Sequence, residues 1–234
     1  MKSTILFISC EHGGNDIPPS YQHLFAEQQS VLDSHLGFDF GSLSLAKALS
    51  ETCECRHTFT TTSRLLVDCN RSKTNPRVFS EFTNTLPKSE KQNIINHHYL
   101  PYRNQAEGFI QNYIEQGSQV LHLSMHTFTP VFNSITRNAA IGLLYDPSRH
   151  GEKEVARLWY SLLTQYPPSY RIRMNYPYRG GSDGFTSSLR KKYTEEQYLG
   201  IEVETNQAIL QDPHSFAEVQ TILSASLKEL LQLL

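Results

Sequence analysis

This sequence has few cysteines and almost no net charge, and each of these features argues against a class of protein. Cysteine occurs four times, and Cys53-Glu54-Cys55 lacks the two-residue spacer of redox or zinc-knuckle pairs, so we expect reduced thiols and no disulfide framework. The 21 basic residues face 23 acidic ones, which leaves a net charge of -2. A chain with so little net charge has no field that would gather nucleic acid or an anionic membrane, and a small-molecule partner is expected instead.

Long apolar runs are missing as well. The first apolar run, Ile5-Leu6-Phe7-Ile8, has one lysine before it and is too short for a signal sequence or a membrane span. We therefore expect a cytoplasmic protein.

The composition is that of a folded protein with a substantial core. The chain has 234 residues, of which 38% are hydrophobic, 19% charged and 11% aromatic. This length suits one α/β domain, and we expect a single domain over residues 1–234.

Apolar patterns along the chain predict alternating strands and helices. The expected strands are residues 4–10, 58–62, 120–125, 140–145 and 198–204. The expected helices are residues 36–49, 89–116 with an interruption at Pro101, 153–165 and 216–234, and residues 175–188 are expected as a long loop. This order predicts a mostly parallel mixed sheet with helices on both faces, and ligands beyond the carboxyl ends of its strands.

Two histidines are placed where such a sheet could bind a metal. His12 follows the first strand and precedes two glycines, and His126 stands where the strand at 120–125 is expected to end. Either histidine alone is more often structural, but two at strand ends can converge on one ion. Catalytic zinc usually has three protein ligands, so a carboxylate is expected as the third. On position alone, the candidates are Asp39, Asp16, Glu11 and Asp68.

Other polar residues follow apolar stretches. Asn70 and Arg71 come just after residues 65–67, and an arginine fork there can bind a substrate carboxylate through two hydrogen bonds. In Ile201-Glu202-Val203-Glu204-Thr205, strand alternation directs Glu202 and Glu204 to the same face. Two carboxylates in an apolar strand are costly unless they are paired or functional, so one of them is a candidate general acid/base, and an exposed edge strand is the alternative.

Six short motifs follow one another along nearly the whole chain. They are Glu11-His12-Gly13-Gly14-Asn15 with Ile17-Pro18, Gly37-Phe38-Asp39-Phe40-Gly41, Ser63-Arg64 with Asp68-Cys69-Asn70-Arg71, Ser124-Met125-His126-Thr127-Phe128-Thr129-Pro130, Asn175-Tyr176-Pro177-Tyr178, and Glu204-Thr205-Asn206-Gln207-Ala208. In this order they resemble the N-formylglutamate amidohydrolase family, which is related to carboxypeptidases and aspartoacylase. The resemblance implies a zinc-exopeptidase-like (phosphorylase/hydrolase-like) fold. It also implies hydrolysis of an N-acyl amino acid such as N-formylglutamate, with Zn²⁺ as cofactor and metal-bound water as nucleophile.

The resemblance also implies roles for individual residues. They are His12 and His126 as zinc ligands with Asp39 as the favoured third, Asn70 and Arg71 as the carboxylate site, Arg137 and Tyr178 as substrate contacts, and Glu204 as the acid/base with Glu202 beside it. Two positions depart from the pattern of relatives. Asn15 stands where carboxypeptidase-like relatives have a glutamate ligand, and Tyr176 replaces a glutamate common in the Asn-Glu-Pro-Tyr loop, so the acyl group need not be formyl.

Two alternative functions use the same residues. A zinc carboxypeptidase-like peptidase would cut a peptide instead of an N-acyl amino acid, and the size of the cavity around residues 175–185 would distinguish the two. A metal-free carboxylate-binding protein that has lost catalysis would keep Asn70 and Arg71 without a metal ligand set. The acyl group, the amino acid and the oligomeric state are not predicted by the sequence.

Overall fold

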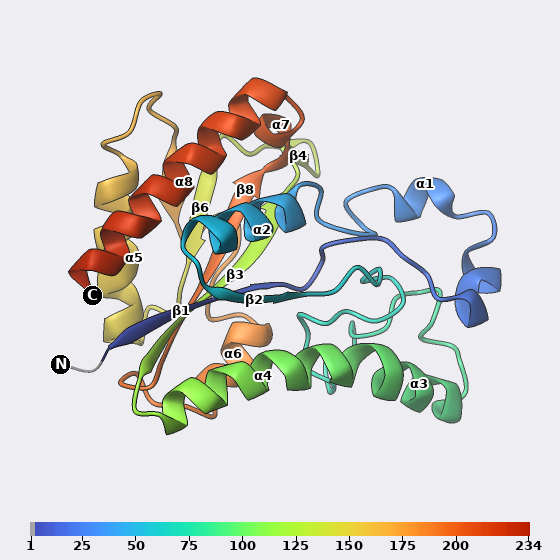
Figure 1. The fold of residues 1–234 in the computed structure, drawn as a ribbon. Coiled ribbons are helices and arrows are strands. Elements are labelled where there is room, and N and C mark those ends of the chain that lie inside the picture. The colour runs from blue at the N-terminus through green and yellow to red at the C-terminus, as the bar shows by residue number, and fades with distance from the viewer. Residues whose placement is uncertain (1–2) are drawn as a thin grey trace.

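The fold is built around a six-stranded sheet in the order β2-β1-β3-β8-β6-β7, as seen in a computed structural model that describes residues 3–234 (Figure 1). Its strands are β1 (Thr4–Cys10), β2 (Arg56–Phe59), β3 (Gln119–Phe128), β6 (Ile141–Leu144), β7 (Ile172–Met174) and β8 (Tyr198–Asn206). All neighbouring pairs are parallel except β6 with β8. The predicted mostly parallel mixed sheet is confirmed.

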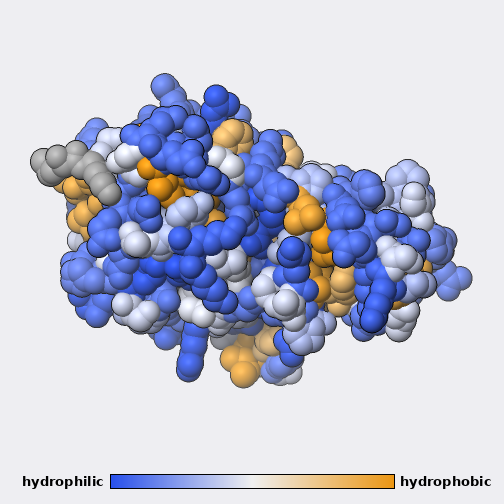
Figure 2. All heavy atoms as spheres, turned by 90° about the horizontal axis from the view of Figure 1, so that it is seen from below, coloured by the Kyte–Doolittle hydropathy of each residue, from blue (hydrophilic) through white to orange (hydrophobic). Residues whose placement is uncertain are grey.

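Helices cover both faces of the sheet. In Figure 1, α2 (Ser42–Thr52) and α8 (Pro213–Leu233) lie above the sheet and α5 (His150–Leu163) at its left, whereas α3 (Lys88–Ile94), α4 (Leu100–Glu115) and α6 (Phe185–Arg190) lie below it. The short elements are η1 (Pro19–Phe25), α1 (Gln29–Leu32), η2 (Ile95–Tyr99), α7 (Gln207–Leu210) and the hairpin of β4 (Val131–Phe132) and β5 (Ile135–Thr136). The lower face, which carries α3 and α4, is largely hydrophilic with scattered apolar patches (Figure 2).

Strand alternation divides the core into two clusters, because successive side chains of a strand point to opposite faces. Ile8, Leu123 and Val203 belong to the cluster under α2, α5 and α8. Phe7 and Val120 belong to the cluster on the α4 side. The polar residues at the carboxyl ends of β1, β3 and β8 therefore share the α4 side of the sheet.

Several expected boundaries differ from the structure. The strand expected at 58–62 is observed as β2 (Arg56–Phe59), and the loop at 175–188 ends where α6 begins. The helix expected at 89–116 does not break at Pro101; α3 continues through a π-helical stretch (Ile95–Tyr99) into α4, which contains Pro101 in its first turn. Proline has no backbone N–H and cannot donate the usual helical hydrogen bond. The wider π-helical turn lies next to the position where this hydrogen bond is missing.

The expected helix at 36–49 is wrong in its first part, because α2 begins only at Ser42. Gly41 adopts a left-handed conformation with φ of 80°, which stops a helix from extending backwards through it. A side chain at Gly37 would lie 2.0 Å from the backbone oxygen of Leu32, so the turn there needs a glycine. The chain between these glycines is therefore free of helical geometry and can cross towards the end of β1.

Candidate metal centre and active site

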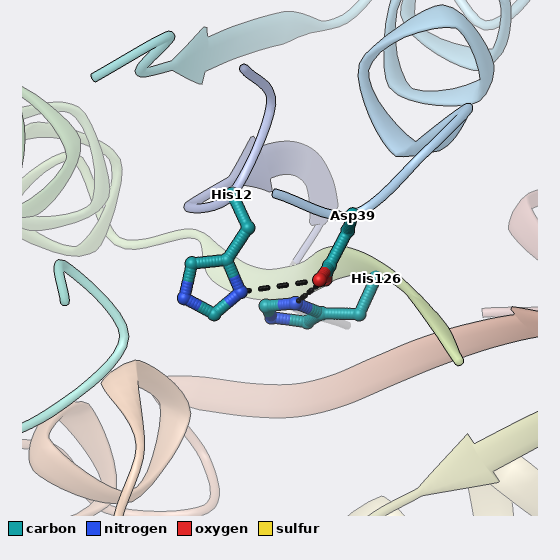
Figure 3. Close-up of side chains that lie close together, drawn as sticks. All are labelled: His12, Asp39 and His126. Atoms are coloured by element: carbon teal, nitrogen blue, oxygen red, sulfur yellow. Dashed lines mark hydrogen bonds and ion pairs between the residues drawn. The ribbon is translucent and has the colours of Figure 1, made fainter. Parts of the chain in front are cut away.

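Three side chains from distant parts of the chain meet at the carboxyl end of the sheet (Figure 3). His12 lies in the loop after β1, Asp39 in the segment before α2, and His126 near the end of β3. One ligand atom from each residue lies within 4.8 Å of the other two, and all three residues are buried. This donor set, two imidazoles and a carboxylate, is one that metal ions such as zinc accept.

The backbone places Asp39 beside His12. The Asp39 N–H donates to the carbonyl oxygen of His12 over 2.9 Å, and the Ser42 N–H donates to the carbonyl of Asp39 as α2 begins. Asp39 Oδ2 then lies 3.3 Å from Nδ1 of His12 and 2.9 Å from Nδ1 of His126. A tetrahedral ion with ligands at about 2.1 Å separates its donor atoms by roughly 3.4 Å, which the 3.3 Å spacing matches and the 2.9 Å hydrogen-bond spacing approaches.

The outer nitrogen of each histidine is held by a second carboxylate. Nε2 of His12 lies 2.7 Å from Oδ1 of Asp68, and Nε2 of His126 lies 3.1 Å from Oε2 of Glu11. Metal-binding histidines usually have such a partner, because it orients the ring and makes it a better ligand. The nitrogens free to bind a metal are thus the two Nδ1 atoms that face Asp39.

The other carboxylates considered as third ligand occupy different places. Asp68 and Glu11 are buried but contact the outer nitrogens of the histidines, and Asp16 is exposed. Asn15, at the position where relatives have a glutamate ligand, donates to Asp33 over 2.7 Å. The geometry therefore favours Asp39.

Electrostatic coupling in the cluster is strong. Burial lowers the pKa of His126, but hydrogen bonds to Asp39 and Glu11 outweigh it and raise that pKa well above its ordinary value. Burial raises the pKa of Asp39, and the neighbouring His12 and His126 reverse this and hold it well below its usual range. Without a metal, the cluster therefore keeps a positive charge between its carboxylates.

Glu202 and Glu204 lie on the same face of β8, as strand alternation predicts, and they differ sharply in their contacts. Glu202 Oε1 accepts a hydrogen bond from the Thr186 hydroxyl over 2.6 Å. Glu204 pairs in register with His126, and among residues 3–234 its Oε2 is a buried atom without a hydrogen-bond partner. Burial raises the pKa of Glu204 to about 8, and the charges of Asp39 and Glu202 add to the effect. A carboxyl group with a pKa near neutrality can both accept and donate a proton.

A cavity of about 260 Å³ opens onto the candidate metal cluster of His12, Asp39 and His126 and onto both glutamates. Asn70 and Arg71 line it, as do Tyr178 and Arg179. Asn70 Nδ2 lies 3.4 Å from Nε2 of His126, and Asn70 Oδ1 accepts from the backbone N–H of Phe185 over 2.7 Å. The predicted carboxylate site and the metal cluster thus share one cavity.

Arg71 is anchored from two sides. Its NH1 donates to the backbone oxygen of Asp183 over 3.0 Å, and its Nε lies 3.7 Å from Oδ2 of Asp68. Asp183 also accepts hydrogen bonds from the Ser72 backbone and the Asn75 side chain. These contacts hold the guanidinium of Arg71 at the cavity wall.

Arg137 lies outside the residues that line this cavity. It is buried, and its NH1 donates to the hydroxyl of Tyr178 over 3.2 Å. Tyr178 is 46% exposed and does line the cavity. Arg137 is therefore placed to act through Tyr178.

Two arginines of the site were not assigned roles from the sequence. Arg64 bridges two cluster carboxylates, with NH1 3.4 Å from Asp39 Oδ1 and NH2 3.1 Å from Asp68 Oδ2. Arg179 lines the cavity from the loop before α6. Arg64 lies in the Ser-Arg motif that the sequence displays, whereas no pattern marked Arg179.

None of the helices formed by residues 3–234 is long and apolar enough to span a membrane.

No protein with a curated description matches the chain. Among solved structures, gene product Atu2144 from Agrobacterium tumefaciens is 26% identical, with a TM-score of 0.82 over 99% of this chain and 91% of that one. N-formylglutamate amidohydrolase from Ralstonia eutropha is 17% identical and shares the fold, with a TM-score of 0.69 over 99% of this chain and 94% of that one. Residues 4–211 match the model of the N-formylglutamate amidohydrolase family, and the chain therefore belongs to this family of hydrolases acting on amides.

Proposed function

We propose that this protein is a zinc-dependent amidohydrolase that cuts the amide bond of an N-acyl amino acid, with N-formylglutamate as the first candidate. One observation carries the proposal. The two imidazoles and the carboxylate of His12, Asp39 and His126 converge beside Glu204, whose buried Oε2 has no partner among the described residues. A buried carboxyl atom without a partner is costly, and a site for metal and substrate gives it one.

The metal would be held by Nδ1 of His12, Nδ1 of His126 and a carboxylate oxygen of Asp39. Zinc in such a site acts as a Lewis acid and lowers the pKa of water to about 7. The contribution of Asp68 and Glu11 is to orient the two rings through their outer nitrogens.

Glu204 moves the protons of the reaction. It accepts a proton from the attacking water and donates it to the leaving nitrogen, which must depart as an amine. Its position opposite His126 in the β3–β8 ladder places it beside the cluster. Glu202 supports this carboxyl group from the same face, and its own contact with Thr186 holds it in place.

Arg64 supplies positive charge where the carbonyl oxygen becomes negative. It lines the cavity while contacting Asp39, so a substrate carbonyl near the cluster lies within its reach. A fixed cation in a partly desolvated site stabilises a developing oxyanion at little reorganisation cost.

Arg71 and Asn70 bind the carboxylate of the amino-acid half of the substrate. Arginine is suited to this role because its planar fork can make two parallel hydrogen bonds to one carboxylate. Arg179, in the same cavity, offers a second cation for a side-chain carboxylate such as that of glutamate. The substrate half in this cavity is therefore an acidic amino acid.

A metal assay combined with a substrate screen tests the proposal. Purified protein should contain about one zinc per chain and hydrolyse N-formyl-L-glutamate. Chelation should abolish this activity and added zinc should restore it. If the protein binds the carboxylate compound but contains no zinc and does not hydrolyse it, a metal-free binding protein is favoured. If the protein releases C-terminal residues from peptides and does not hydrolyse N-acyl amino acids, a peptidase is favoured.

A further inference from the structure

The active-site cavity is one of two chambers that meet at the metal cluster. The second chamber has a volume of about 590 Å³ and shares Asp39, Arg64, Arg71, Thr127 and Tyr178 with the first. An amide substrate also has two halves, one on each side of the bond that is cut. Two chambers that meet at the reacting centre can therefore each receive one half.

The smaller chamber matches the amino-acid half in charge. Its volume is about 260 Å³, less than half that of the larger chamber. Asn70 and Arg179, which suit carboxylates, line this chamber and not the larger one, and Arg71 lies where the two chambers meet. The acyl half is then directed into the larger chamber.

The larger chamber has room for much more than a formyl group. Its volume of about 590 Å³ is more than twice that of the smaller chamber, whereas formyl has only about two non-hydrogen atoms. A formyl substrate would leave most of this space to water. Part of the lining is apolar, with Leu36, Phe79, Phe128 and Phe132 among its residues.

Two exposed aromatic rings of the wall, Phe132 and Tyr178, pack against one buried arginine, Arg137. Phe132, in the hairpin of β4 and β5, is 44% exposed and lines the chamber. The guanidinium carbon of Arg137 lies 4.5 Å from the ring centre of Phe132 and 5.1 Å from that of Tyr178. Such cation–π contacts hold both rings at the wall, and the exposed side of Phe132 is left for a ligand.

We propose that the larger chamber binds the acyl group of the substrate and that the enzyme prefers an apolar acyl chain of several carbons over formyl or acetyl. This inference rests on the proposed amidohydrolase function and names its substrate class. Arg137 is then a positioning residue for acyl specificity, because it acts through Phe132 and Tyr178.

A series of N-acyl-L-glutamates tests the chamber. We expect kcat/KM to rise about three- to fourfold for each added methylene from acetyl through butyryl to hexanoyl, which corresponds to the burial of one methylene. The comparison starts at acetyl because the formyl carbonyl is intrinsically more reactive.

Two variants and a control test whether the acyl preference depends on residues that line the larger chamber. Phe132→Ser should lower the hexanoyl-to-acetyl ratio of kcat/KM threefold or more, and Leu36→Trp should narrow the chamber and lower the same ratio. Val131→Ser is the matched control, because Val131 is 53% exposed on the same strand and outside the chamber lining, and this variant should keep the ratio.

Calorimetry on the chelator-treated protein separates binding from catalysis. N-hexanoyl-L-glutamate should bind at least tenfold more tightly than N-acetyl-L-glutamate, and Phe132→Ser should reduce this difference.

If kcat/KM does not change with acyl length and the two compounds bind equally tightly, the chamber assignment is overturned even if N-formylglutamate is hydrolysed. Faster cleavage of a blocked dipeptide ending in glutamate would overturn it in favour of a peptide occupant. Tighter binding of the hexanoyl compound without any hydrolysis would support the chamber and refute the proposed function alone.

Discussion

Replacement of Glu204 by glutamine should remove the proton carrier while keeping the shape of the side chain. Glu204 is 4% exposed, and its Oε2 has no hydrogen-bond partner among the described residues, so the change breaks no hydrogen bond of that atom. General acid–base catalysis contributes about 10²- to 10⁴-fold, which corresponds to roughly 3 to 5 kcal/mol of barrier. We therefore expect kcat on the best N-acyl amino acid to fall by about that factor, with the zinc content unchanged because the three proposed ligands are intact.

Glu202→Gln is the matched control, since Glu202 lies two residues earlier on the same face and already contacts Thr186. Losing one charge-assisted hydrogen bond there should cost about tenfold or less in kcat. Steady-state kinetics and metal analysis on both variants decide the assignment. A large loss for Glu202→Gln with an active Glu204→Gln would reverse the two roles, and full activity of both variants would refute the mechanism.

Three further predictions concern metal affinity, substrate binding and pH. Asp68→Asn should weaken zinc binding about 10- to 100-fold in a competition assay, because Asp68 orients His12 without being a proposed ligand; unchanged affinity would contradict this role. Arg71→Lys keeps the charge but loses the planar fork, so kcat/KM should fall at least tenfold, and an unchanged value would remove Arg71 from the carboxylate site. Burial lowers the pKa of His122 to about 4, so the unfolded state binds the extra proton between pH 6.5 and 4. The free energy of unfolding should therefore drop by up to about 3 kcal/mol as the pH falls through this window. His122→Gln should flatten this dependence in denaturant titrations, and an equally steep slope in the variant would refute the assignment.

Local patterns in the sequence were sufficient to predict the features of the fold that depend on the geometry of a single strand. The period of two in a strand predicted that Glu202 and Glu204 share a face, and the structure shows both beside the same cavity. The apolar runs predicted β1, β3 and β8, and therefore that His12 and His126 stand at the carboxyl end of the sheet. These statements need no knowledge of how distant segments pack, because each follows from a few adjacent residues.

Only the tertiary structure shows where each candidate carboxylate lies relative to the two histidines. Asp39 and Asp68 are far apart in sequence and both reach His12, but one faces its Nδ1 and the other its Nε2. That difference depends on the turn through Gly37 and Gly41, where helical spacing alone predicted a helix.

The reversed direction of β6, the bridging position of Arg64 and the chamber beside Phe132 likewise depend on segments that meet only when the chain folds. Periodicity describes which face of an element a residue occupies. Long-range packing decides which other residue it contacts there. The sequence around a residue carries no signal of which distant segment that contact comes from.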